Sequence, residues 1–322
     1  IAANDFGAHF TLARLAPYAG SADAALLADA EKSANSLLRA DKPAHVPDAQ
    51  WPEFKKQAGF IGHQAMGWAA MQQKKNDAAE QSFVKALELT PGAAQVSYWL
   101  GTVVLAQKNP EKNTLALFSF ARAAAFDGPG ALTPAGRQQI DAYLTKVYKG
   151  YHGDDSGLAE LKQVAKTQPL PPADLRIKSG EEIKAEKEEE LRKTNPLLAI
   201  FMNIKEGLTG ADSAGFWGSM KGTAMPKLRG RVISAKPGVK PKVVELAMSQ
   251  SENVEVSLST PETPARCLID AGADIEFEGA EAVEFTRSPF LIKMSGGKIL
   301  SGWKEPPAPV RKAPVGKKAA GK

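Results

Sequence analysis

The feature that most constrains the fold is a run of five residues: Gly67, Ala79, Phe83, Ala86 and Pro91. Small residues and one large aromatic residue recur at spacings that place them on helix faces, and a proline closes the run. Small residues let two helices approach closely, and the aromatic ring fills the space between them. The run therefore predicts two tightly packed helices, the second of which ends before the proline.

The same pattern recurs farther along the chain. Gly101 follows Gly67 by 34 residues. The later members return 37 residues after their counterparts, as Ala116, Phe120 and Ala123. The three extra residues fall in the turn around Pro110, where an insertion adds little loop-closure entropy. Two copies in nearly the same phase predict a repeated helix pair.

This signature resembles that of tetratricopeptide repeats, which are units of about 34 residues built from two helices. The first unit covers residues 60–93, and a third, degenerate pair of helices is expected over 133–168. Stacked repeats of this family present a concave surface that binds other proteins, and they do not form catalytic centres. The resemblance therefore implies an interaction protein.

In this family, recurring positions on the first helix of each unit line the concave groove. In this sequence the resemblance assigns these groove positions to Ile61, Gln64, Trp68, Met71 and Gln72 in the first unit and to Gln95, Tyr98, Thr102, Leu105 and Ala106 in the second. The lysines and asparagines with which some members hold a terminal carboxylate are absent from this set. Trp68 and Tyr98 instead predict an aromatic groove for an extended or helical peptide. The alternative is that helices from the N-terminal segment fill the groove from within.

From about residue 227 the apolar period changes from helical to two, as in Val244, Leu246 and Met248. Five or six short strands with glycine- and proline-marked turns are expected there. A set of short strands needs closure to hide its edges, so we expect a small antiparallel β-barrel, and the order of strands resembles an OB-like barrel. The expected fold class is α+β multidomain, with helical repeats followed by the barrel.

Five regions follow from these patterns. They are an N-terminal helical segment at 1–53 with a helix over 23–39, the repeats at 54–168, a linker with connector helices at 169–226, the barrel at 227–303 and a disordered basic tail at 304–322. Within the connector, the glycine-rich stretch 207–226 is expected to be irregular but packed. The tail accounts for the net charge of +5, because it holds six lysines and arginines against Glu305 alone.

No motif predicts an enzyme, a cofactor or a metal site. The four histidines (His9, His45, His63 and His152) show no spacing typical of metal ligands. Cys267 is expected to be a small buried side chain. The acidic residues between Asp274 and Glu284 alternate along a strand and are expected to form a solvated face. No run approaches the roughly 18 apolar residues of a membrane span.

The favoured function is a non-enzymatic scaffold or adaptor that binds a protein or peptide segment. One alternative is a nucleic-acid-binding protein that uses the barrel and the tail, although residues 231–276 contain no aromatic side chain on which a base could stack. The other is a self-assembling structural or cell-surface subunit. The arrangement resembles uncharacterised exported bacterial repeat proteins. Because the chain begins at Ile1, we expect a removed leader and a periplasmic or extracellular location, with the cytoplasm as the alternative.

Overall fold

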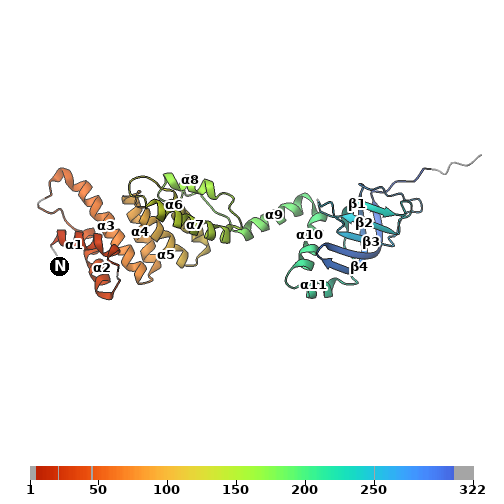
Figure 1. Ribbon diagram of the computed structural model, residues 1–322, viewed down its shortest axis with the longest axis horizontal. Helices are drawn as coiled ribbons and strands as arrows, with labels where there is room; N and C mark the ends of the chain where they lie inside the picture. Colours follow the sequence, from red (N-terminus) through yellow and green to blue (C-terminus); the bar gives the residue numbers. More distant parts are fainter. Residues whose placement is uncertain (1–4, 21, 45, 250, 308–322) are drawn as a thin grey trace, which may run out of the picture. The chain divides into compact units, whose positions relative to one another are not determined.

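A computed structural model shows the helical region followed by a closed five-stranded β-barrel, which confirms the expected α+β class (Figure 1). The structure describes residues 5–20, 22–44, 46–249 and 251–307. The chain divides into two compact units, Ile1–Ile183 and Lys184–Lys322. The basic tail expected at 304–322 lies outside the described residues from 308 onward, so its expected disorder stays a prediction.

The first unit is built from helices with short connections. Its elements are α1 (Phe6–Leu15), η1 (Ala16–Tyr18), α2 (Ala24–Arg39), η2 (Asp48–Gln50), α3 (Trp51–Gln72), α4 (Asn76–Leu89), α5 (Ala94–Ala106), η3 (Pro110–Lys112), α6 (Asn113–Ala125), α7 (Pro134–His152) and α8 (Leu158–Thr167). From α1 to α7 each helix packs on the next one along the chain, and α8 packs on α6. This sequential packing is typical of a helical array.

The helix ends follow local chemistry. α4 ends two residues before Pro91, because the proline cannot continue the helix. α7 begins at Pro134, and the side chain of Thr133 caps it by accepting a hydrogen bond from the backbone N–H of Gly136 at 3.1 Å. Both helices expected over 133–168 are therefore present as α7 and α8, but α8 packs mainly on α6. α1 was not expected, and the side chain of Asp5 caps it.

The second unit begins within α9 (Gly180–Thr194) and continues with α10 (Pro196–Thr209) and α11 (Ser213–Met220). α11 lies in the stretch expected to be irregular. Its start is fixed by the side chain of Asp212, which accepts a hydrogen bond from the backbone N–H of Gly215, and Phe216 and Trp217 pack on the barrel core. Tertiary packing therefore outweighs the low helix propensity of its two glycines.

The barrel consists of β1 (Leu228–Lys236), β2 (Val243–Ala247), β3 (Val256–Ser259), β4 (Asp274–Arg287) and β5 (Phe290–Ser301). The strands close in the order β1-β2-β3-β5-β4. Their pairings are antiparallel except that β3 and β5 are parallel, so the expected small antiparallel barrel is present with one parallel pairing. A hairpin turn joins β4 to β5, so β5 runs antiparallel to β4, and this sets its direction beside β3.

The interior of the barrel is apolar and is covered by α10. Phe201 and Leu208 of α10 are fully buried in the same cluster as Leu246 and Phe277 from the strands. Cys267 belongs to this cluster too, and burial raises the pKa of its thiol. In the part of the chain that the structure describes, every helix is too short or too polar to span a bilayer.

Candidate functional site

The residues of the repeat signature lie where two helices cross closely. A Cβ atom on Gly67 would lie 2.6 Å from the ring of Phe83, and one on Gly101 would lie 3.0 Å from the ring of Phe120. The other small members are fully buried (Ala79, Ala86, Ala116 and Ala123). Pro91 is exposed and follows the end of α4. A side chain at Gly67 would therefore force the ring of Phe83 to shift, and one at Gly101 would make a tight contact with the ring of Phe120.

In the first unit, three of the residues expected to line the groove are buried by other parts of the chain. The exposed fractions of Ile61, Gln64 and Trp68 are 3%, 5% and 4%. Ile61 packs in a cluster with Ala13 of α1, and Trp68 packs in a cluster with Ala16 of η1. Of the remaining pair, Met71 is half-buried and Gln72 is exposed. The N-terminal helices thus lie over most of this part of the groove.

α1 lies along α3 and runs in the same direction. At the start of both helices the ring of Phe6 lies 5.2 Å from that of Phe54. Beyond the end of α1, the hydroxyl of Tyr18 accepts a hydrogen bond from Nε2 of Gln64 at 3.0 Å. The ring of Tyr18 also lies 6.0 Å from that of Trp99 on α5. The α1–η1 segment therefore follows α3 and ends beside α5.

The residues expected to line the groove in the second unit are less buried than those in the first. Thr102 is exposed, and Tyr98 and Leu105 are half-buried. Gln95 is half-buried and Ala106 is exposed as well. The ring of Phe120 lies 6.0 Å from that of Tyr98 and 5.2 Å from that of Tyr143 on α7, and 44% of Tyr143 is exposed.

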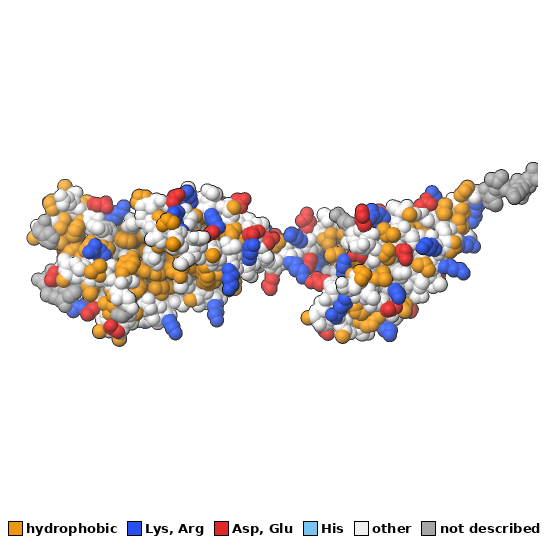
Figure 2. Space-filling view, viewed as in Figure 1, with side chains coloured by type: hydrophobic (Ala, Val, Ile, Leu, Met, Phe, Trp, Pro, Cys, Tyr) orange, Lys and Arg blue, Asp and Glu red, His pale blue; other side chains and the backbone are white. Residues whose placement is uncertain are grey.

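We call the surface made by Tyr98, Thr102 and Leu105 of α5 together with Tyr143 of α7 the tyrosine face. None of these side chains is charged. Figure 2 shows hydrophobic side chains gathered over the part of the unit where Figure 1 labels α5 and α7. Tyr143 was missed by sequence reasoning, because the third helix pair lacks the signature residues from which a groove position could be assigned.

Arg122 on α6 is a second residue that the sequence did not single out. Its side chain is 3% exposed, and its guanidinium donates to the backbone carbonyls of Ala165, Lys166 and Pro91 at 2.9, 2.6 and 2.9 Å. It also stacks on Phe126, 3.8 Å from the ring centre. These carbonyls belong to the last turn of α8 and the region just after α4, where cations are favoured by the helix dipole. Arg122 therefore joins three segments of the helical unit.

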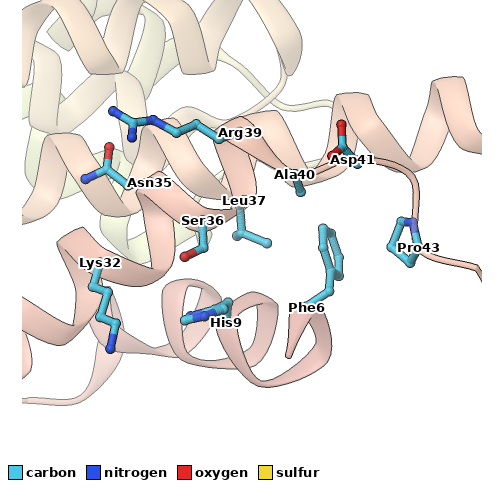
Figure 3. A pocket seen from close by; sticks show the side chains of 10 residues that line it. All are labelled: Phe6, His9, Lys32, Asn35, Ser36, Leu37, Arg39, Ala40, Asp41 and Pro43. Atoms are coloured by element: carbon cyan, nitrogen blue, oxygen red, sulfur yellow. The ribbon is translucent and has the colours of Figure 1, made fainter. Parts of the chain in front are cut away.

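A cavity of about 690 Å³ lies between α1, α2 and the segment that follows α2 (Figure 3). His9 lines it and is 1% exposed. Its Nδ1 lies 3.0 Å from Oγ of Ser33, and its Nε2 has no hydrogen-bond partner among the described residues. In Figure 3 the charged ends of Lys32 and Arg39 do not converge on the ring. The polar groups therefore form no concentrated site, and the His9–Ser33 contact joins α1 to α2.

His63 and His152 lie on different helices, α3 and α7. His63 on α3 is half-buried, and burial, followed by the charge of Lys85, lowers its pKa. His152 bonds to the backbone carbonyl of Lys178 and to Ser156, and His45 lies outside the described residues. Among the residues described, no group of three or more His, Cys, Asp or Glu side chains is placed to hold a metal ion.

Acidic residues of β4 are paired with basic residues on or next to the neighbouring strands β1 and β5. Nζ of Lys293 lies 2.8 Å from Glu284, and Lys227 and Arg229 pair with Glu276 and Asp274 at 2.7 and 2.9 Å. These pairs are at least partly exposed, so each contributes little to stability. Three acidic side chains of β4 are therefore paired within the barrel.

One buried carboxylate joins α10 to the barrel. Glu255 is 3% exposed and accepts hydrogen bonds from Nζ of Lys205 at 2.6 Å and from the backbone N–H groups of Met248 and Ser249 at 3.0 and 2.8 Å. Burial alone would raise the pKa of Glu255, but these hydrogen bonds together outweigh burial and lower it. Glu255 therefore stays ionised near neutral pH.

Taken together, these observations define a class: a two-unit protein with an α-helical array, a five-stranded barrel and an uncharged aromatic face on the array. Comparison with known proteins found no matching family model and no significant match among the curated proteins.

Proposed function

We propose that the chain is a non-enzymatic adaptor of the tetratricopeptide type that binds a protein segment on the tyrosine face. The observation that supports the proposal is the difference in burial between corresponding side chains in the first and second units of the array. Ile61, Gln64 and Trp68 are covered by the N-terminal segment formed by α1, η1 and α2, whereas Tyr98, Thr102 and Tyr143 are open to solvent to different degrees. Exposed aromatic groups on a rigid helical scaffold are typical of protein-binding surfaces.

The side chains of the tyrosine face restrict the kind of ligand that it can bind. Its side chains offer ring faces, hydroxyl groups and methyl groups but no charge. A partner that depended on a terminal carboxylate or a phosphate would find no cation among them. The face therefore suits an apolar segment with a few hydrogen-bonding groups. Because aromatic side chains often carry a large share of binding energy, Tyr98 and Tyr143 are the expected hot spots.

The adaptor proposal is tested by partner capture. The full chain, immobilised by a tag, is exposed to extract of its source cells beside the Tyr143→Ala variant. We expect a discrete set of partners on the wild-type chain and recovery about tenfold lower with Tyr143→Ala, equivalent to about 1.4 kcal/mol. Val283→Ala is the matched control, because Val283 is also an exposed apolar side chain, 52% exposed, but lies on the barrel. Equal recovery by all three chains would refute the proposal.

A further inference from the structure

We infer that α1 is released from the helical array when the ring of His9 takes up a proton, while the rest of the array stays folded. The position of α1 in the structure is called the docked state below. The inference is independent of the proposed adaptor function. It rests on the burial of the His9 ring, on the partners of its two nitrogens and on the small number of buried side chains that hold α1.

The ring of His9 lies at the contact between α1 and α2, beside the cavity of Figure 3. It is 1% exposed, and its Nδ1 lies 3.0 Å from Oγ of Ser33. A neutral imidazole carries one N–H group, whereas a charged imidazolium carries two. After protonation both nitrogens are donors, and Nε2 has no acceptor among the residues that the structure describes. The docked state therefore offers one partner to a charged ring that needs two.

The charged groups around the cavity do not compensate a positive charge on His9. Lys32 and Arg39 of α2 and Asp41 after α2 line it, so two cations stand against one carboxylate. On α1 itself, Asp5 lies one turn before His9, and its carboxylate already caps the helix. The α3 side chains that pack against α1 are apolar, and η1 has no charged residue. A charge on the buried ring is therefore costly.

α1 is held by few buried side chains. It spans ten residues, of which His9 and Ala13 are buried. Phe6 and Phe10 are half-buried, and Leu15 is 52% exposed. A helix of this length is marginally stable without tertiary contacts, and segments with few buried apolar contacts open before the rest of a protein. A single buried charge is therefore enough to shift the balance between docked and released α1.

The direction of the effect follows from linkage between proton binding and release. In the docked state the charged ring is buried without a second partner, whereas in the released state water solvates it. The released state therefore binds the proton more readily, and acid favours release. Because an exposed histidine changes charge near about pH 6.5, we expect release between about pH 7.5 and about pH 5. Release would expose apolar side chains that α1 packs against, such as Phe54.

Hydrogen exchange of the full chain, followed by mass spectrometry, tests this inference. We expect the amides of α1 to lose protection at least about tenfold between about pH 7.5 and about pH 5, after correction for the intrinsic exchange rate. The amides of α5 in the same sample should keep their protection, because the inference confines the change to α1. Equal loss in both helices would indicate general acid unfolding and would overturn the inference.

Two variants separate His9 from the other histidines. His9→Gln keeps a neutral polar side chain at every pH, so protection of α1 should no longer depend on pH. His63→Gln is the matched control, because His63 also lies on a helix of the first unit and is half-buried. This variant should keep the loss of α1 protection in acid. Persistence of the loss in His9→Gln, or its disappearance in His63→Gln, would count against the inference.

A measurement on the wild-type chain decides the case in which His9→Gln fails to hold α1 at any pH. The ring nitrogens of His9 are followed by NMR on a ¹⁵N-labelled sample across the same pH range. We expect the ring to become charged at the pH at which α1 loses its protection. A ring that becomes charged while α1 stays protected, or α1 protection that does not change with pH, would overturn the inference.

Discussion

Gly67 lies against the ring of Phe83 so closely that an added methyl group would be 2.6 Å from it. Gly67→Ala should lower the free energy of unfolding of the helical unit by about 1–3 kcal/mol, because overpacking displaces the ring. Gly150→Ala is the control, since no neighbouring atom lies within 4 Å of its Cβ position on α7. That change should raise stability by up to about 1 kcal/mol. Urea denaturation measures both, and equal effects would contradict the packing argument.

Glu255 gives a prediction about pH. Its folded-state pKa is lowered, so its stabilising contribution is present above the unfolded pKa and is lost as pH falls through the folded pKa. Glu255→Gln removes a carboxylate that accepts from Lys205 and two backbone N–H groups, and should cost the barrel about 1–3 kcal/mol at pH 7. The difference between wild type and variant should shrink below about pH 4. A difference independent of pH from 7 to 3 would contradict this assignment.

At the scale of elements, α8 depends on one side chain from α6. Arg122→Ala would leave the carbonyls of Ala165, Lys166 and Pro91 without their donor, at a cost of about 2–4 kcal/mol. We expect hydrogen exchange of the α8 amides to accelerate more than that of α3, because α8 packs mainly on α6. Uniform acceleration across the helical unit would show that Arg122 has no such local role.

The sequence predicted elements well where a side-chain pattern was strong. The spacing of Gly67, Phe83 and Pro91 located α4 and its crossing with α3. The alternation of apolar and polar side chains located the strands. α1 and α11 were missed because their helical state comes from contacts. α1 is held by Phe54 and Ile61 of α3, and α11 by the apolar core of the barrel.

The candidate site was predicted in part for the same reason. The repeat positions indicated Tyr98 and Thr102, but they gave equal weight to Trp68, which η1 and α2 cover. Whether a helix face is open depends on which other helix lies over it, and the repeat pattern alone does not contain that information. Tyr143 became recognisable only through its contact with Phe120.

At the scale of the whole molecule, the two units have separate cores. The barrel core draws its residues from 198–303, and the clusters of the helical unit end at Ile177. Gly67→Ala and Glu255→Gln should therefore each shift the unfolding transition of one unit and leave the other unchanged within about 0.5 kcal/mol. Tryptophan fluorescence and far-ultraviolet circular dichroism, followed together during denaturation, would detect this. A single shared transition that both variants move equally would indicate one cooperative unit.

The central claim is that the open tyrosine face binds a protein partner. Site-specific photo-cross-linking tests it most directly, with benzoyl-phenylalanine placed at Thr102 or, as a control, at Gln81 of the full chain in extract of its source cells. Both positions are exposed. A discrete protein adduct at position 102 that is absent at position 81 is the predicted result. The absence of an adduct at 102, or the same adduct at both positions, would contradict the account.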